Sequence, residues 1–317
     1  MTDQPSLPLV AVSGLSRHFG AHYAVDNISF SLHKNQVLGF LGPNGAGKST
    51  TMQMLCGCLA PSNGTIKING IDLLEHPLEA KRQLGFLPEQ PPLYTEFSVD
   101  EYLELCAKLK GIHKKRIARD VDDAKQRCGL SSNGKRLIGN LSKGYQQRVG
   151  IAQAIIHKPQ VIVLDEPTVG LDPLQIQEIR RLIKEISADC GVILSTHILP
   201  EVEIACNAVQ IIRQGKLVFS DSIRNITQQK ANSLILGLAN PPPINALASI
   251  PNVTGVEQLD NTHYRVHFYP DNSPVDSIVA KSVEQGWRLM KLNAETRSLE
   301  QIFVTLINSE PQAQSSL

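Results

Sequence analysis

The sequence predicts an α/β protein whose doubly wound core is followed by a smaller α+β domain. Three observations lead to this prediction. Residues 37–42, VLGFLG, form a nearly continuous apolar run that ends in a glycine-rich turn, as in a buried strand of a parallel sheet. Apolar strands then alternate with amphipathic helices. Beyond residue 232 the order of strands and helices changes, which indicates a second domain.

Composition limits the classes of protein to consider. The chain has 317 residues, of which 42% are hydrophobic and 19% charged, and its net charge is +1. This length supports a sizeable core and two domains, and the charge gives no overall attraction to nucleic acid or to acidic membranes. No apolar run approaches the roughly 18–20 residues of a membrane span, and the first residues do not resemble a signal peptide. The six cysteines form no paired CxxC motif, so we expect buried, reduced thiols and a cytoplasmic protein.

The first part of the chain predicts an antiparallel sheet beside the first parallel strand. Residues 10–19 and 24–32 alternate apolar and polar side chains, as half-buried strands do. The strand at 37–42 leads through its glycine-rich turn into a helix at about 48–58. A short strand then ends at Asn69 and Gly70, a pair that favours a tight hairpin turn.

The middle of the chain contains a helical insertion, after which the α/β pattern resumes. Residues 93–140 have helical spacing and many charges. Strands follow at 161–167 and 191–197, with amphipathic helices at 173–189 and 199–206. Residues 208–220 predict a hairpin with Gly215 at its turn. We therefore assign residues 8–225 to one domain, with a helical subdomain at about 93–140.

The last third of the chain predicts a separate accessory domain. Apolar periodicity is lost at 226–232, and residues 233–309 then predict the order β-α-β-β-α-β with a closing helix, which is a ferredoxin-like plan. Residues 310–317 are expected to be a disordered tail. Four aromatic residues either line a ligand surface or belong to the core: Tyr264, Phe268, Tyr269 and Trp287.

The glycine-rich turn carries a phosphate-binding motif. Residues 42–50, GPNGAGKST, fit G-x-x-x-x-G-K-[ST] between a strand and a helix. Glycine lets successive backbone N–H groups point at phosphate oxygens, and the helix N-terminus adds partial positive charge. Lys48 is expected to reach the β- and γ-phosphates of a nucleotide, Ser49 to bind Mg²⁺, and Thr50 to hold a further phosphate oxygen. The predicted nucleotide-binding residues here are Gly42, Pro43, Asn44, Gly45, Ala46, Gly47, Lys48, Ser49 and Thr50.

Two carboxylates are expected to face this loop. Four apolar residues place Asp165 at the carboxyl end of a parallel strand, which is the edge where α/β sheets bind ligands. Asp165 is expected to hold Mg²⁺, directly or through water. Glu166 is the predicted catalytic residue that orients or deprotonates the attacking water. Either carboxylate taken alone has a simpler explanation as a helix cap or an exposed charge.

A further motif, LSKGYQQR at residues 141–148, lies about twenty residues before these carboxylates. Its serine–glycine turn suggests a nucleotide held between two subunits. With all three motifs in place, residues 8–225 resemble the ATP-binding subunit of an ABC transporter, and LSKGYQQR followed by VGIAQAII is similar to the ABC-2 exporter branch, which includes multidrug and gliding-motility-type ATPases. The family's usual signature is LSGGQ. Lys143 and Tyr145 depart from it, while Ser142 and Gly144 keep the positions that contact the γ-phosphate.

The resemblance implies roles for three other positions. Phe19 occupies the place of an aromatic ring that stacks on adenine, although a core aromatic at a strand end is the alternative. His197 matches the switch histidine that contacts the γ-phosphate and is counted with Glu166 as catalytic. Asp172, in the GLDP segment, matches the loop that crosses the dimer interface.

The segment LGFLPEQPPLY matches the family's Q-loop but departs from it. The usual glutamine falls at Glu89, with Gln90 directly after it. Alignment favours Glu89 and chemistry favours Gln90 as the residue near the metal, so both remain candidates.

The resemblance also implies a mechanism and partners. Two copies, or this chain and a paralogue, are expected to face each other head to tail, each ATP lying between residues 42–50 of one subunit and residues 142–144 of the other. ATP hydrolysis with Mg²⁺ would then drive export through a separate integral membrane permease, placing the chain at the cytoplasmic face of the inner membrane. No nucleic acid partner is expected. The alternative is a soluble ABC ATPase that acts on ribosomes or DNA; a P-loop kinase is a third, weaker interpretation.

Overall fold

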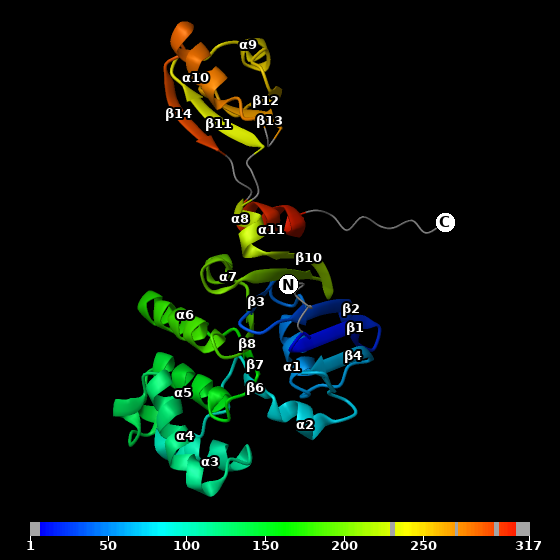
Figure 1. Ribbon diagram of the computed structural model, residues 1–317, viewed down its shortest axis with the longest axis vertical. Coiled ribbons are helices and arrows are strands. Elements are labelled where there is room, and N and C mark those ends of the chain that lie inside the picture. The colour runs from blue at the N-terminus through cyan, green and yellow to red at the C-terminus, as the bar shows by residue number, and fades with distance from the viewer. Residues whose placement is uncertain (1–6, 229–231, 270–271, 295–297, 309–317) are drawn as a thin grey trace, which may run out of the picture. The chain divides into compact units, whose positions relative to one another are not determined.

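The chain divides into two compact units. The computed structural model describes residues 7–228, 232–269, 272–294 and 298–308, and the units are Met1–Ile223 and Arg224–Leu317 (Figure 1). The division lies beside the predicted break at residues 226–232, of which 229–231 fall outside the described residues. Residues Ile223–Gln228 form a short helix, α8. The predicted tail at 310–317 lies outside the described residues as well.

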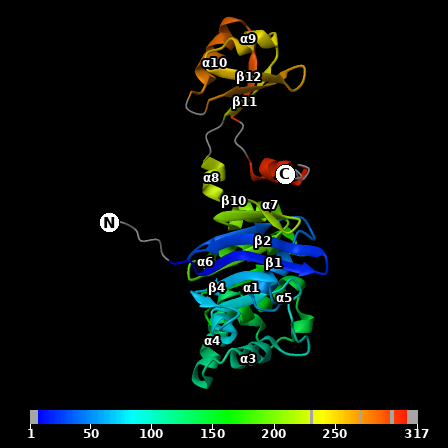
Figure 2. The ribbon, with the colours of Figure 1, turned by 90° about the vertical axis from the view of Figure 1, so that its right-hand side faces the viewer.

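The first unit contains a four-stranded antiparallel sheet. Its strands lie in the order β2-β1-β4-β5, and Figure 2 shows β1, β2 and β4 side by side. Asn69 and Gly70, between β4 and β5, both have left-handed backbone angles, with φ of 49° and 81°, as the predicted hairpin turn requires. The bounds are β1 Val10–Phe19, β2 His22–Leu32, β4 Asn63–Ile68 and β5 Ile71–Asp72.

The second sheet of this unit is the predicted parallel core. Its six strands lie in the order β10-β9-β3-β8-β7-β6. All neighbours run parallel except the β9–β10 hairpin. The bounds are β3 Val37–Leu41, β6 Leu84–Leu87, β7 Val161–Asp165, β8 Gly191–Thr196, β9 Ala208–Arg213 and β10 Lys216–Ser222.

Strand register brings the site segments together. Leu41 pairs with Thr196, and Asp165 pairs with Ser195. The carboxyl ends of β3, β7 and β8 therefore meet at one edge of the sheet, and each leads directly into a segment that the sequence predicts to be functional.

Helix α1 joins the two sheets through a shared core. It runs over Lys48–Leu55, three residues shorter than predicted, because Cys56 and the left-handed Gly57 end it. Its buried Met52, Met54 and Leu55 belong to the same apolar cluster as Phe40 of β3. This packing fixes the phosphate loop, since the loop is the only connection between β3 and α1.

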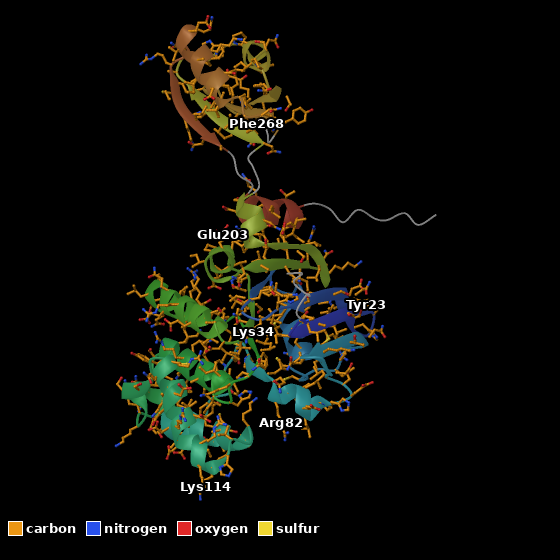
Figure 3. All side chains as sticks on the ribbon, in the orientation of Figure 1. Tyr23, Lys34, Arg82, Lys114, Glu203 and Phe268 are labelled. Carbon is orange, nitrogen blue, oxygen red and sulfur yellow. The ribbon has the colours of Figure 1, made fainter. Side chains whose placement is uncertain are left out.

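The predicted insertion at 93–140 is helical, but the helical part continues beyond it. Residues 141–148 do not form a turn: Ser142 is the N-cap of helix α5, and Gly144 lies in its first turn. Lys114 marks the start of α4 (Figure 3). Ser98 and Glu101 cap α3 reciprocally. The bounds are α3 Val99–Leu109, α4 Lys114–Arg127 and α5 Lys143–Ile155.

The remaining helices of this unit follow the strands of the parallel sheet. The helices α6 and α7 lie close to the predicted ranges, and α2 is a short helix that the sequence analysis did not predict. The bounds are α2 Pro77–Arg82, α6 Pro173–Ser187 and α7 Leu199–Ala205. The expectation of buried thiols is met by four cysteines but is wrong for the exposed Cys58 and the half-buried Cys106.

The second unit has the predicted β-α-β-β-α-β order. Its antiparallel sheet has the strand order β12-β13-β11-β14. Tyr264, Phe268 and Trp287 lie in its core, whereas Tyr269 is 68% exposed. The bounds are β11 Ser233–Leu238, α9 Ile244–Ala248, β12 Val253–Gln258, β13 His263–Phe268, α10 Val275–Glu284, β14 Leu289–Ala294 and α11 Leu299–Asn308.

Removing the Phe40 ring tests the role of the shared core. Phe40 is fully buried and packs on Phe30, with ring centroids 5.2 Å apart. We expect Phe40→Ala to lower the free energy of unfolding of the first unit by about 3–5 kcal/mol, because it removes buried apolar area and leaves a cavity. Urea unfolding followed by circular dichroism measures the change. Leu74→Ala, at a side chain that is 52% exposed, is the control, and a loss at Phe40 no larger than the control's would contradict this account.

Candidate functional site

A cavity of about 350 Å³ opens at the edge where β3, β7 and β8 end. It brings together the phosphate loop, the segment after β7 and the segment after β8. Its lining residues are Ala24, Asn44, Gly45, Gly47, Lys48, Ser49, Thr50, Glu89, Glu166, Val169 and His197. Most of the catalytic and phosphate-loop positions that the sequence predicts therefore share one cavity.

Two glycines allow the phosphate loop to adopt its course. Gly47 has a φ of 106°, and a Cβ added there would lie 2.4 Å from the carbonyl oxygen of Ala24. A Cβ on Gly42 would lie 2.4 Å from the carbonyl oxygen of Ile212. A side chain at either position collides with backbone that cannot move freely. The close approach of β2 and β9 to the loop thus explains why the motif needs glycine there.

Lys48 is a buried cation held by acceptors of the loop and by one carboxylate. Its side chain is 5% exposed. The ammonium donates to the carbonyl oxygens of Gly42 at 2.9 Å and Pro43 at 3.3 Å, and its nitrogen lies 3.2 Å from Oε1 of Glu166. A buried ammonium requires such partners, because its loss of hydration is otherwise uncompensated.

Glu166 stands between two nitrogen groups. Its second carboxylate oxygen, Oε2, lies 2.9 Å from Nδ1 of His197, while Oε1 faces Lys48. The Glu166 backbone has a φ of 49°, which is unusual for a residue other than glycine. Its N–H donates to the carbonyl oxygen of Ser195 at 3.1 Å. The strained turn directs the carboxylate into the cavity instead of along the sheet.

Asp165 lies beneath the cavity and does not line it. Its Oδ1 accepts hydrogen bonds from the hydroxyls of Ser195 and, at 3.3 Å, Ser49. Burial raises the pKa of the Asp165 carboxyl above its ordinary value, and the negative charge of Glu166 raises it further, against the opposing effect of the two hydroxyls and Lys48. The pair of Asp165 and Ser49 thus offers two hard oxygen atoms of the type that Mg²⁺ binds.

Several predicted nucleotide-binding residues lie outside the cavity wall. Gly42 and Pro43 contribute through the carbonyl oxygens that accept from Lys48, and Ala46 is buried at 3% exposure. Phe19 does not line the cavity: its ring is 51% exposed and lies under the Arg17 guanidinium, 4.6 Å from the ring centroid. It is a surface aromatic and not the core aromatic that was the alternative.

The two Q-loop candidates differ in position. Glu89 lines the cavity, and Gln90 does not. Both follow β6 in an exposed bend. The geometry of this chain therefore favours Glu89.

Ser142 and Gly144 are not part of the cavity of their own chain. Ser142 is exposed at the N-terminus of α5, and its side chain makes no capping hydrogen bond to that helix. Gly144 is buried, and a Cβ there would lie 2.5 Å from Oε1 of Gln175. Asp172 is the N-cap of α6 and accepts from the backbone N–H groups of Leu174 and Gln175, each at 3.0 Å. Asp172 therefore has a structural role within its own chain.

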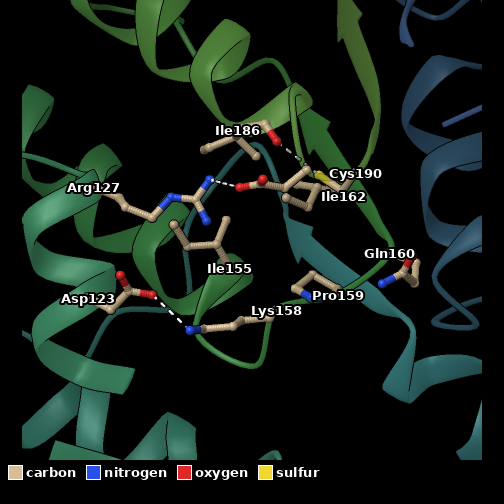
Figure 4. A pocket seen from close by; sticks show the side chains of 10 residues that line it. Asp123, Arg127, Ile155, Lys158, Pro159, Gln160, Ile162, Ile186 and Cys190 are labelled. Atoms are coloured by element: carbon tan, nitrogen blue, oxygen red, sulfur yellow. Dashed lines mark hydrogen bonds and ion pairs between the residues drawn. The ribbon is translucent and has the colours of Figure 1, made fainter. Parts of the chain in front are cut away.

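A second cavity, of about 530 Å³, lies among α4, α5 and α6 and not at the phosphate loop (Figure 4). Two ion pairs cross it: Arg127 with Asp189 at 2.8 Å, and Lys158 with Asp123 at 3.1 Å. The rest of its lining is largely apolar, and no predicted site residue contributes to it.

The sequence analysis missed three residues of the site. Ala24 and Val169 line the cavity, and the Ser195 hydroxyl holds Asp165. Ser195 had a signal, since it is the first polar residue after the apolar start of its strand, and it lies directly opposite Asp165 in the parallel register. Ala24 and Val169 had none, because small apolar residues carry no chemical pattern.

Comparisons with known proteins identify the type of chain that has this site. The family model for the ABC transporter matches residues 25–169. The chain is 33% identical to the bacitracin transport ATP-binding protein BcrA of Bacillus licheniformis, over 94% of this chain and 97% of that protein. It is 30% identical to YxlF, an uncharacterized ABC transporter ATP-binding protein of Bacillus subtilis, over 95% of this chain and all of that protein. A solved ATP-binding subunit of an ABC transporter covers 70% of this chain at 32% identity with a TM-score of 0.63. These relatives favour transport over the ribosome or DNA alternative.

Replacing Asp165 tests how much its buried carboxylate lowers the stability of the fold. Because burial disfavours the ionised carboxylate, we expect Asp165→Asn to raise the Tm of the nucleotide-free protein at pH 7 by about 2–4 °C, the shift that roughly 1 kcal/mol gives in a domain of this size. The difference should shrink as the pH falls through the raised pKa, since wild-type Asp165 then becomes neutral too. Differential scanning calorimetry measures both, with Glu203→Gln at an exposed carboxyl as control. A lower Tm at pH 7 would contradict the argument.

Proposed function

Because the chain belongs to the ATP-binding subunits of ABC transporters, we propose that it powers export through a separately encoded membrane permease. Members of this family hydrolyse ATP, and the chain is such an ATPase. One observation supports the proposed mechanism most: Lys48, Glu166 and His197 share a cavity from which Ser142 and Gly144 of the same chain are absent. Such a cavity is half of a site that a second subunit completes.

ATP would bind with its phosphates on the phosphate loop. The N–H groups of residues 44–50 and the N-terminus of α1 supply donors and partial positive charge. The adenine ring would stack on the face of Phe19 opposite the Arg17 guanidinium, and stacking of this kind gives little base selectivity. Mg²⁺ would be held by Ser49 and Asp165, and it supplies charge neutralisation at the phosphates when bound. Glu89 is the Q-loop residue that we assign to the same region.

Hydrolysis would begin with a change of partner at Lys48. The γ-phosphate is a stronger anion than the carboxylate now 3.2 Å from the ammonium, so it would displace Glu166 from Lys48. Glu166 is then free to accept a proton from the attacking water. His197, with 42% of its side chain exposed, would contact the γ-phosphate from the other side of the cavity.

The second subunit would complete the site with Ser142 and Gly144. Ser142 presents an exposed hydroxyl at the N-terminus of the 13-residue helix α5, where helix polarity favours an anion. Asp172 would lie near the same subunit interface, because it caps α6, and Gln175 of that helix lies against Gly144. The partner is a second copy or a paralogue. Loss of the γ-phosphate would remove charge-assisted contacts and let the subunits separate.

The permease would dock in a groove of about 440 Å³ between α2, α3 and α5. Leu78 and Leu109 expose 79% and 78% of their surface beside it. Lys81, Arg82 and Lys110 also line it, so an amphipathic cytoplasmic segment with acidic residues would fit. Gln153 of the groove donates to the carbonyl oxygen of Phe86 in β6 at 2.7 Å, and β6 leads to Glu89.

Because its proposed partner is a membrane permease, the chain would work at the cytoplasmic face of the inner membrane. In the described residues, no helix is long and apolar enough to span a membrane.

Glu166→Gln tests the catalytic assignment. We expect ATP binding to persist and steady-state phosphate release to fall at least about 100-fold, because an amide cannot accept the proton. Size-exclusion chromatography in ATP should then show a stable dimer. Turnover close to that of the wild type would overturn the role of Glu166.

Substitution of Glu89 and Gln90 separates the two Q-loop candidates. We expect Glu89→Ala to lower ATP turnover about tenfold or more and to raise the Mg²⁺ concentration needed for half-maximal activity, because its carboxylate lines the cavity. Gln90→Ala, at the neighbouring exposed residue, should stay within about twofold of the wild type. The reverse ranking would assign the role to Gln90.

Charge reversal in the groove tests permease docking. Arg82→Glu combined with Leu109→Glu should abolish co-purification of a polytopic membrane protein from detergent-solubilised membranes of the native host. The ATPase activity of the isolated chain should remain within about twofold, since neither side chain lines the nucleotide cavity. Lys114→Glu, which repeats the charge reversal of Arg82→Glu at a residue outside the groove (Figure 3), is the control. Recovery of only soluble partners by the wild-type chain would argue against export.

A further inference from the structure

Glu201 is a buried carboxylate near the nucleotide cavity that the proposed reaction does not use. It lies in α7 and is 1% exposed. In the part of the chain that the structure describes, no lysine, arginine or histidine nitrogen lies within 4.0 Å of its carboxylate oxygens. A buried carboxylate without a cation is costly, so its hydrogen bonds must compensate for the lost hydration.

Two threonine hydroxyls supply those hydrogen bonds. Thr168 donates to Oε1 of Glu201, and Thr196 donates to Oε2 at 2.5 Å. Both threonines are buried, at 3% and 0% exposure. The Thr196 oxygen also accepts from the backbone N–H of Ile198 at 3.1 Å. Each carboxylate oxygen therefore holds a different threonine, and hydrogen bonds to a charged acceptor are strong.

The two threonines belong to the two segments that carry the catalytic side chains. Thr168 lies two residues after Glu166, and Thr196 directly precedes His197. The same two segments meet in the cavity, where Nδ1 of His197 lies 2.9 Å from Oε2 of Glu166. The Glu201 carboxylate thus holds the two segments together at a second point, in addition to the contact between His197 and Glu166.

His197 needs such support because packing does not hold its ring. Its side chain is 42% exposed, and Glu166 holds a strained backbone angle with a φ of 49°. An exposed ring and a strained turn keep one relative position only when the surrounding structure restrains both.

We propose that Glu201 is a positioning residue for ATP hydrolysis: it holds Thr168 and Thr196 together and so keeps His197 within hydrogen-bonding distance of Glu166. This inference rests on the proposed roles of Glu166 and His197. It assigns to Glu201 no contact with nucleotide, and it explains why a carboxylate is buried there without a cation.

Paired variants test this positioning role. Glu201→Gln and Thr168→Val should each lower kcat about tenfold, the scale expected for loss of a hydrogen bond to a charged group. KM for ATP should stay within about twofold, since the phosphate loop is untouched. Thr168→Ser, which keeps the hydroxyl, should recover most of the activity. Glu203→Gln, at an exposed carboxyl of the same helix (labelled in Figure 3), is the matched control.

The decisive measurement repeats Glu201→Gln and Thr168→Val in a His197→Ala background. If Glu201 and Thr168 act through His197, neither change should lower kcat by more than about twofold in the His197→Ala background. A full additional tenfold loss would overturn the proposal, as would variants that lower the Tm but keep the kcat of the wild type. If His197→Ala and Glu166→Gln alone leave kcat unchanged, the proposed catalytic roles of these two residues are wrong, and the positioning role of Glu201 is wrong as well. That outcome differs from one in which only the Glu201 and Thr168 variants leave kcat unchanged.

Discussion

The buried ammonium of Lys48 is the constraint on which the site depends. At 5% exposure it must have negatively charged or carbonyl partners. The phosphate loop provides two carbonyl oxygens, and Glu166 provides the only carboxylate within 4.0 Å among the described residues. Glu166, the carboxylate that we propose to be catalytic, is therefore the counter-ion of Lys48 in this structure. A bound γ-phosphate would take over that task and, by doing so, release Glu166 for chemistry.

The fold provides this arrangement at one edge of the parallel sheet. Three strand ends converge there, and the segments that follow them carry Lys48, Glu166 and His197. Two features oppose local stability, namely the left-handed backbone of Glu166 and the buried Asp165, whose pKa is raised by burial. Both are tolerated because the apolar cluster around α1 and Phe40 holds the surrounding strands. Burial of Glu201 against two threonines adds a polar restraint on the same segments.

Much of the fold and of the candidate site could be predicted from sequence because the signals are local. A glycine-rich turn between a strand and a helix, or a carboxylate after four apolar residues, depends on near neighbours only. Where the prediction was incomplete or wrong, long-range contacts decided the outcome. Residues 143–155 form helix α5 with Ser142 at its N-cap position but without a side-chain capping hydrogen bond, and Gly144 of its first turn lies against Gln175 of α6, although the serine–glycine pair favours a turn. Glu201 and Glu203 are neighbouring acids of α7, and what marks Glu201 is its burial against Thr168 and Thr196, which belong to distant parts of the chain. For Glu89 and Gln90, alignment and side-chain chemistry point to different residues, and the cavity geometry favours Glu89.

The central claim is that this chain forms half of each nucleotide site and that a second subunit completes it. The most direct test is a structure of the protein with Mg²⁺ and a non-hydrolysable ATP analogue. We expect the γ-phosphate to lie on Lys48 of one subunit, within about 3 Å of the Ser142 hydroxyl and the Gly144 N–H of the other, a normal hydrogen-bonding distance. Glu166 should no longer contact Lys48. A nucleotide enclosed by one chain, with Ser142 and Gly144 facing solvent in both subunits, would contradict the account.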